Sequence, residues 1–382
     1  MESSTSNDSD GKSRPWCIEP FVTLESKVWG NWGLCCRSKP LKEHARNVSP
    51  LEHFNSDTMK RIRLDMLNHT KTDEIKSLCA KCIEHEANGV QSRRQQKRHM
   101  NPPRVEKDGS IQFYKFNTVE VKFFGNLCNL QCRMCGPLYS SSIAATQRKQ
   151  GEWHGPVHHD VWKDYQAGDK IQFFADMKEI LLNTDLVKFT GGEPMMNAGI
   201  LDFIEWMVLQ KLSHGLRLKI ITNGTKLNQD LLNFSKHFRS FDIAVSVDGV
   251  FDVDEYQRVG TDFWEVDHNI DVLKRYGNVT MTTTVTAINV SSLDELMMYS
   301  KAKQVPIDIT SIALFPDYLQ VKVLPSEYRF ELYKSNPNYP LQVKKTLLDP
   351  EWPVDLWEKF RDKNPNITEI IPELGKYYAS RI

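Results

Sequence analysis

Three cysteines on one short stretch are the residues of this chain best suited to chemistry. Cys128, Cys132 and Cys135 follow the spacing C-x3-C-x2-C, directly after a strand-like run over Thr118–Phe124. Three thiolates on one loop can hold three corners of a cubane iron–sulfur cluster and leave the fourth iron without a protein ligand. Because such an iron can coordinate a small molecule, the spacing predicts a reactive centre rather than a plain electron carrier. Zinc is the alternative, but it prefers four closed ligands, so a fourth would have to come from elsewhere in the chain.

A second motif, Thr-Gly-Gly-Glu-Pro, occupies residues 190–194. It follows a short apolar run, which reads as a strand, and it precedes a helix expected from near Asn197. Glycines at a strand end let the backbone approach a ligand closely, since no Cβ stands in the way. Glu193 offers an acceptor for a charged amine. A Gly-Gly pair by itself is typical of a turn, so the motif gains weight only beside the cysteines.

Two more apolar runs end in polar residues at similar spacing. Residues 218–225 end in Asn223-Gly224, and residues 242–249 carry Ser246 and Asp248 near their end. In parallel α/β sheets, ligands collect at the carboxyl ends of the strands. The sequence therefore predicts that these side chains lie near the cysteine loop.

Together these motifs resemble the signature of radical S-adenosylmethionine enzymes. In that family the open iron is chelated by the methionine part of S-adenosylmethionine, and one electron yields a 5′-deoxyadenosyl radical that abstracts hydrogen from a substrate. The resemblance implies that Cys128, Cys132 and Cys135 hold the catalytic [4Fe-4S] cluster. It implies cofactor-binding roles for Met134, Gly191, Gly192, Glu193, Asn223, Ser246, Asp248 and Arg258. For Arg258, a solvated or structural role carries equal weight.

The other five cysteines all precede residue 100: Cys17, Cys35, Cys36, Cys79 and Cys82. Their arrangement resembles the auxiliary-cluster region called SPASM, in its shortened twitch form, placed before the barrel instead of after it. The resemblance implies that Cys17, Cys35, Cys79 and Cys82 bind a second [4Fe-4S] cluster. It selects Cys35 over Cys36, whose side chain should diverge from its neighbour's. Zinc is again the alternative, since a Cys-x2-Cys pair with two distant cysteines is an ordinary zinc pattern.

The middle of the chain alternates between strand and helix patterns. We expect helices over residues 227–237, 266–276 and 291–303, and strands over residues 279–287 and 306–314. Such alternation implies a parallel sheet with right-handed crossovers. The fold class is α/β, and six repeats fit a partial (β/α)6 TIM-like barrel of the radical S-adenosylmethionine type. From the pattern alone, an open doubly wound sheet is the alternative.

The predicted layout has five parts: a disordered tail over residues 1–13, an N-terminal cysteine domain over 14–100, a linker over 101–116, the barrel over 117–315 and a C-terminal helical extension over 316–382. In the cysteine domain, helices are expected over residues 55–68, with Ser56 as cap, and over 82–100. The connection over residues 147–170 carries His154, His158 and His159, for which we expect no catalytic role.

Composition excludes several classes of protein. Lys and Arg number 49, as do Asp and Glu, so no global basic field argues for nucleic acid or an anionic membrane. No stretch approaches the ~20 apolar residues of a membrane span. The polar start is not a secretory signal, and clustered thiols suit a reducing compartment, so we expect a cytoplasmic protein.

The sequence thus predicts an enzyme in which the auxiliary cluster accepts an electron from a substrate radical. Net oxidation or cross-linking of a peptide or protein is favoured, with a reducing partner such as flavodoxin or ferredoxin. The alternative is a dehydrogenase or modifying enzyme acting on a sugar or nucleotide-like small molecule. A different class, an iron–sulfur electron carrier or a zinc-stabilised binding module, would not need the amine acceptor of the Gly-Gly-Glu-Pro motif.

Overall fold

A single nine-stranded sheet organises the chain in the computed structural model, which describes residues 15–87, 91–164, 167–350 and 353–378. The strand order is β3-β2-β1-β4-β5-β6-β7-β8-β9. Strands β4 to β9 are parallel to their neighbours, β1 is parallel to β4, and β2 and β3 add an antiparallel edge. The strands are β1 (Thr23–Ser26), β2 (Asn31–Gly33), β3 (Pro40–His44), β4 (Thr118–Glu120), β5 (Leu186–Phe189), β6 (Arg217–Thr222), β7 (Ser240–Ser246), β8 (Asn278–Val285) and β9 (Ile307–Ile312).

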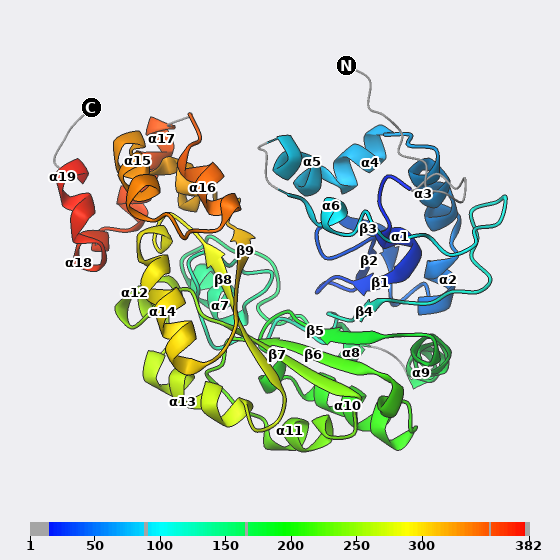
Figure 1. The fold of residues 1–382 in the computed structure, drawn as a ribbon. Helices are drawn as coiled ribbons and strands as arrows, with labels where there is room; N and C mark the ends of the chain where they lie inside the picture. Colours follow the sequence, from blue (N-terminus) through cyan, green and yellow to red (C-terminus); the bar gives the residue numbers. More distant parts are fainter. Residues whose placement is uncertain (1–14, 88–90, 165–166, 351–352, 379–382) are drawn as a thin grey trace.

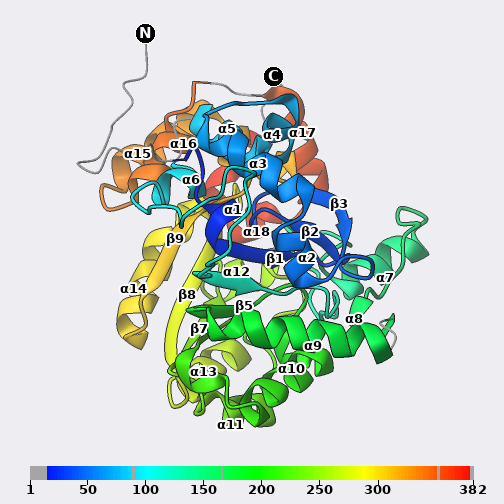
Figure 2. The same ribbon diagram turned by 90° about the vertical axis from the view of Figure 1, so that its right-hand side faces the viewer.

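Helices connect the barrel strands on the outer side of the sheet. Both views place α9, α10, α11, α13 and α14 there, while the N-terminal and C-terminal segments lie on the opposite side (Figures 1 and 2). The connecting helices are α7 (Ser141–Lys149), α8 (Val161–Asp164), α9 (Ala167–Leu182), α10 (Ala198–Leu209), α11 (Gln229–Ser235), α12 (Asp252–Gln257), α13 (Phe263–Leu273) and α14 (Leu293–Lys303).

The order of the strands confirms the predicted fold class. From β4 to β9 each strand pairs with the next strand along the chain. A doubly wound sheet reverses its order at a switch point, whereas a TIM-like barrel proceeds in one direction. The six parallel strands therefore form a partial (β/α)6 barrel, and the open doubly wound alternative is wrong.

Strand β6 shows how the sequence forms the wall of the barrel. Leu218 and Ile220 are fully buried, whereas Lys219 and Ile221 on the other face line the hollow of the barrel. Side chains alternate between the faces of a strand, so one row packs against the outer helices and the other faces inward. The same alternation runs along β8, where Met281 is buried and Thr282 faces inward.

Several predicted boundaries need correction. The strand expected over Thr118–Phe124 is only Thr118–Glu120, because beyond it the Lys122 N–H donates to the Ser26 Oγ at 2.8 Å instead of continuing the ladder. The helix expected over residues 82–100 is two helices, α5 (Ala80–Ala87) and α6 (Arg93–Gln96), since Ser92 and Gln95 form a capping box that begins a new helix. Helix α12 was not predicted.

The N-terminal segment continues the barrel sheet through β1. Its helices are α1 (Glu19–Val22), α2 (Pro50–Phe54), α3 (Asp57–Leu67), α4 (Asp73–Leu78), α5 and α6. The predicted cap is present, since the Ser56 side chain accepts from Met59 N. Buried Arg63 donates to three backbone carbonyls, those of Pro20, Phe54 and Gly109, and so ties α3 to α1, to α2 and to the connection that precedes β4. The expected tail over residues 1–13 lies outside the described residues.

Helices close the C-terminal end of the chain, as predicted. They are α15 (Ser326–Ser335), α16 (Leu341–Leu347), α17 (Val354–Lys363), α18 (Ile367–Ile370) and α19 (Gly375–Tyr378). Their aromatic side chains serve packing, since Trp357 and Phe360 are buried and stack on each other. Over the described part of the chain, no helix is long and apolar enough to cross a membrane.

Candidate functional site

The three cysteines lie on the loop that joins β4 to α7. Ser140 caps α7 by accepting from Ile143 N, and its hydroxyl donates to the Leu130 carbonyl at 2.7 Å. The Cys128 N–H donates to the Ser141 Oγ at 3.2 Å. These bonds hold the loop against the first turn of α7, so all three thiols sit at the carboxyl end of the first barrel strand.

Asn126 fastens this loop to the long connection before α8, a role that the sequence reasoning missed. The Asn126 amide donates to the Pro137 and Val157 carbonyls, and its Oδ1 accepts from His159 N at 2.9 Å. Asn126 is fully buried. The connection thus supports the cysteine loop through these hydrogen bonds. His159 itself is buried, and its ring centroid lies 3.5 Å from that of Trp29. The sequence signal available for this role is an asparagine directly after Gly125.

Arg258 is the cation whose charge acts on all three thiols. Burial raises the pKa of Cys132 to about 12 and that of Cys135 to about 11, while the Arg258 guanidinium lowers both. Burial likewise raises the pKa of Cys128, again with Arg258 opposing. Arg258 follows α12 and donates to Asp248 Oδ2 at 2.8 Å, yet its buried Nε has no partner among the described residues. Arg258 therefore favours thiolates here and keeps one donor for a further group.

The two glycines of the Gly-Gly-Glu-Pro motif let the end of β5 touch the cysteine loop. Gly191 and Gly192 have φ of +93° and +57°. A Cβ on Gly192 would lie 2.4 Å from the Leu127 carbonyl oxygen, a distance at which something must shift. The Glu193 N–H donates to that same oxygen at 2.7 Å. The motif is therefore docked directly beside Cys128.

Glu193 joins two strand ends. Its carboxylate accepts from Met195 N at 3.0 Å, from Thr222 Oγ1 at 2.7 Å and from Asn223 N at 2.6 Å. Burial raises its pKa, and these three donors oppose that effect. Because a carboxylate has about four lone-pair sites, Glu193 can accept one further hydrogen bond. Glu193 thus connects the ends of β5 and β6, in addition to its predicted role in binding an amine.

Of the remaining residues predicted to bind the cofactor, Asn223 and Ser246 lie beside the cysteine loop or the barrel cavity, whereas Asp248 and Met134 make contacts inside the protein. Asn223 is close to the loop: its amide donates to Asn129 Oδ1 at 3.0 Å and lies 3.9 Å from Cys128 Sγ. Ser246 lines the hollow of the barrel. Asp248 is buried, and its carboxylate accepts from Arg258 and from Thr284 N at 2.7 Å. It therefore positions Arg258. Met134 packs against the edge of the core.

We expect Glu193→Ala to have two separable effects. Three buried donors lose their acceptor, which should lower the free energy of unfolding by about 2–4 kcal/mol. Affinity for S-adenosylmethionine should fall by about tenfold or more, because a charge-assisted hydrogen bond is lost. Urea unfolding and equilibrium dialysis measure the two, with exposed Glu205→Ala on α10 as control. A loss of stability with unchanged affinity would leave Glu193 only as a tie between strands.

The four N-terminal cysteines meet at one cavity. Cys17, Cys35, Cys79 and Cys82 all line it, although they come from three separate stretches of the segment. Cys79 ends α4 and Cys82 lies in α5. Burial raises the pKa of Cys79 to about 12, and the Arg94 guanidinium opposes that rise. The geometry thus gathers the thiols that the resemblance selected.

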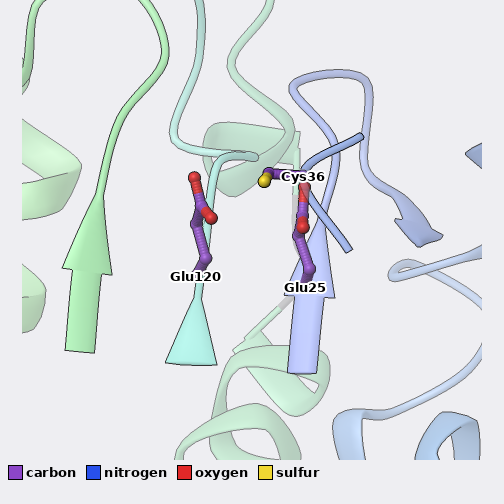
Figure 3. A group of neighbouring side chains, drawn as sticks. All are labelled: Glu25, Cys36 and Glu120. Atoms are coloured by element: carbon purple, nitrogen blue, oxygen red, sulfur yellow. The ribbon is translucent and has the colours of Figure 1, made fainter. Parts of the chain in front are cut away.

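Cys36 faces elsewhere. Its sulfur points toward the carboxylates of Glu25 on β1 and Glu120 on β4, and the ligand atoms of these three residues all lie within 4.8 Å of one another (Figure 3). Cys36 lines the hollow of the barrel instead of the cavity of the other four cysteines. Adjacent side chains at positions 35 and 36 therefore serve two different cavities, as the sequence predicted for a pair whose side chains diverge.

The hollow of the barrel is a cavity of about 680 Å³. Inward-facing residues of β4 to β9 form its wall, and residues of α5 and α6 face it from the N-terminal segment. Cys82 and Arg37 line both this barrel cavity and the cavity of the four cysteines. The two cavities are therefore direct neighbours.

The residues present suit the groups that the resemblance implies. Three thiols on one loop share one arginine, and a Cβ on Gly136, next to Cys135, would meet nothing within 4 Å. Open space beside soft sulfur ligands and an unpartnered buried Arg258 Nε are what a thiolate-bound cluster with a further ligand requires. The donor set therefore fits an iron–sulfur cluster.

Comparisons with solved structures give distant likenesses. Native anSMEcpe with bound AdoMet is 20% identical over 65% of this chain and 62% of its own, with a TM-score of 0.43. Streptococcus suis SuiB bound to precursor peptide SuiA is 11% identical over 85% of this chain and 69% of its own, with a TM-score of 0.40. The chain thus covers less than two thirds of anSMEcpe.

Sequence comparison is more specific about the barrel. No curated protein matches the chain. Residues 123–299 match the model of the Radical SAM superfamily, and this range contains the cysteine loop, the Gly-Gly-Glu-Pro motif, Asn223, Ser246 and Arg258. Residues 123–299 of this chain are accordingly a radical SAM domain.

Proposed function

We propose that this chain is a radical SAM enzyme that reductively cleaves S-adenosylmethionine and abstracts hydrogen from a substrate held in the barrel cavity, with net oxidation or cross-linking. The observation that carries the proposal is the contact between two motifs far apart in sequence. The Gly-Gly-Glu-Pro loop is bonded to the cysteine loop through Glu193 N and the Leu127 carbonyl. A site that binds a metal without S-adenosylmethionine would not need the Gly-Gly-Glu-Pro loop beside the cysteines.

Each group would be held by residues already described. Cys128, Cys132 and Cys135 would bind the catalytic cluster, and Arg258 would favour their ionised forms. The cofactor would lie against the neighbouring strand ends: Met134, Gly191, Gly192, Glu193, Asn223, Ser246, Asp248 and Arg258. When bound, the catalytic cluster with S-adenosylmethionine supplies a hydrogen-abstracting radical, and an auxiliary cluster supplies an electron acceptor.

For the auxiliary [4Fe-4S] cluster we propose Cys17, Cys35, Cys79 and Cys82 as ligands, in a twitch-like domain over residues 14–100 beside a barrel over 117–315. The convergence of all four on one cavity supports this assignment. The shared wall at Cys82 and Arg37 supports a role in electron transfer, because it places the thiols next to the barrel cavity. Zinc in the same cavity is the competing assignment.

Two substrate classes enter the proposal. A peptide or protein is the first, on the resemblance to twitch and SPASM enzymes, with a reducing partner such as flavodoxin or ferredoxin in the cytoplasm. A sugar or nucleotide-like small molecule is the second. The barrel cavity favours the second, because its wall is polar and its volume of about 680 Å³ lies in the usual range for small-ligand sites.

The test is anaerobic reconstitution with iron and sulfide, followed by reduction in the presence of S-adenosylmethionine. We expect slow formation of methionine and 5′-deoxyadenosine even without substrate, measured by chromatography with mass detection. An iron–sulfur electron carrier or a zinc-stabilised binding module would form neither. Absence of 5′-deoxyadenosine from protein that carries the full iron complement would refute the proposal.

A further inference from the structure

The wall of the barrel cavity is unusually hydrophilic. Every barrel strand contributes polar inward-facing side chains: Thr118, Glu120, Lys188, Lys219, Ser246, Thr282, Thr284, Asp308 and Thr310. The interior of a TIM-like barrel is ordinarily filled by bulky branched apolar residues. Among the described residues, only three aliphatic side chains line this cavity, those of Leu186, Ile221 and Ala244. The strands thus form a site that binds through hydrogen bonds and charge.

The charge of the wall is strongly positive. In the described part of the chain, seven cationic side chains line the cavity, against two carboxylates, those of Glu120 and Asp308. The cationic residues are Arg37, Lys81, Arg93, Lys97, Lys122, Lys188 and Lys219. Three come from barrel strands or their ends, and four come from the N-terminal segment, so the cations face the cavity from both sides.

The two carboxylates of the wall already have partners. Glu120 accepts from Lys188 at 3.2 Å and from Thr190 at 2.8 Å, and it forms an ion pair with Lys122 at 3.0 Å. Asp308 accepts from the backbone and hydroxyl of Thr310. Glu25, which faces Glu120 in Figure 3, is likewise paired with Lys122, at 2.8 Å. Glu25 and Glu120 are thus engaged by lysines, whereas Asp308 is hydrogen-bonded to a neutral residue and acts on Lys219 from a distance.

Three cations of the wall remain without a carboxylate within 4.0 Å among the described residues: Arg37, Lys81 and Lys219. Burial lowers the pKa of Lys219, and the ammonium of Lys188 lowers it further, while the carboxylates of Asp242 and Asp308 oppose the shift. A half-buried ammonium beside like charges is costly unless an anion joins it. The cavity therefore favours an anionic occupant.

We propose that the barrel cavity binds a small polyanion, a molecule with phosphate or several carboxylate groups on a hydroxyl-rich frame. This inference rests on the proposed function, which makes the cavity the substrate site. Lys219 and Lys188 on adjacent strands contact the anionic groups, with Arg37 and Lys81 facing them from the N-terminal segment. Threonine and serine hydroxyls of β7, β8 and β9 bind the polar frame.

Titration calorimetry on the reconstituted protein, with S-adenosylmethionine saturating, tests the inference. The probes are glucose 6-phosphate and adenosine monophosphate, each paired with its uncharged counterpart, glucose and adenosine. We expect at least one phosphorylated probe to bind about tenfold or more tightly than its uncharged counterpart. The two pairs distinguish a sugar phosphate from a nucleotide. Equal binding of the charged and uncharged members of both pairs would overturn the inference.

Variants locate the binding. Lys219→Gln should lower the affinity for the phosphorylated probe about tenfold, whereas Lys219→Arg should retain most of it. The control is Lys236→Gln, which replaces an exposed lysine directly after α11 and should leave the affinity unchanged. If Lys219→Gln does not fold, Lys188→Gln replaces it. Retained affinity in both Lys219→Gln and Lys188→Gln would place the anion outside the cavity and reject the inference.

The binding measurements can fail separately from the test for 5′-deoxyadenosine formation. Charge-dependent, Lys219-dependent binding in protein that forms no 5′-deoxyadenosine would retain the anion site and reject the radical mechanism. Formation of 5′-deoxyadenosine, combined with tight binding of an uncharged peptide and no response to Lys219→Gln, would reject the anion site alone.

Discussion

Replacement of Cys128, Cys132 and Cys135 by alanine is expected to remove about four of about eight irons per chain and to abolish 5′-deoxyadenosine formation. The three thiols sit on one loop and share Arg258 as their neighbouring charge, so they should act as a single ligand set. Iron and acid-labile sulfide, measured on anaerobically reconstituted protein, give the cluster count. A radical yield at background level gives the functional loss.

Cys36→Ala is the matched control for that triple variant. Cys36 belongs to neither set of thiols and faces Glu25 and Glu120, so its loss should leave about eight irons. If the triple variant keeps its full iron content, the loop does not hold a cluster. One tightly bound zinc without sulfide in the wild-type protein would contradict the iron–sulfur assignment for both sets of cysteines.

Local patterns were enough to predict the barrel. Strand β8 is threonine-rich and β-branched, and helix α14 begins near the acidic residues expected in a first turn. Those signals depend on neighbours in sequence, so they survive without any knowledge of the fold. Helix α12 was missed because it is only six residues long and carries three acidic residues without a clear apolar stripe. One of its packing partners among the described helices, α18, lies over a hundred residues away.

The site was predictable in its ligands but not in their supports. The spacing of Cys128, Cys132 and Cys135 is visible in sequence, whereas the bonds from Asn126 to the connection before α8 join positions about thirty residues apart. Asp248 was predicted to bind the cofactor from a strand end, and the structure adds that its carboxylate accepts from Arg258. A residue type at a strand end indicates position, and only tertiary contacts decide whether the side chain faces outward or inward.

The charge of the barrel cavity had no signal in the overall composition. Cations and acids balance over the whole chain, so its formal net charge is zero. Lys188 and Lys219 stand on different strands, and only the parallel register of β5 and β6 brings them side by side as paired positions. Arg37 and Lys81 reach the same cavity from the N-terminal segment. An asymmetry of charge that arises by folding cannot be read from a count of residues.

Cys79→Ala should separate cofactor cleavage from completion of the reaction. The variant is expected to lose about four irons and to retain formation of 5′-deoxyadenosine, because Cys79 lies outside the catalytic loop. If the auxiliary cluster takes the electron of the substrate, product formed per 5′-deoxyadenosine should fall about tenfold or more. The physical reason is placement, since the cavity that Cys79 lines shares Cys82 and Arg37 with the barrel cavity.

The measurement compares both products in the same reaction, once a substrate is identified. Ser77→Ala, two positions earlier on α4, controls for disturbance of that helix and should leave the ratio of products unchanged. A cluster that only stabilises the fold predicts a different outcome: less folded Cys79→Ala protein, but a normal ratio of products per folded molecule. Full product yield from protein shown to lack the auxiliary irons would exclude the electron-acceptor role and leave the N-terminal cysteines as a structural site.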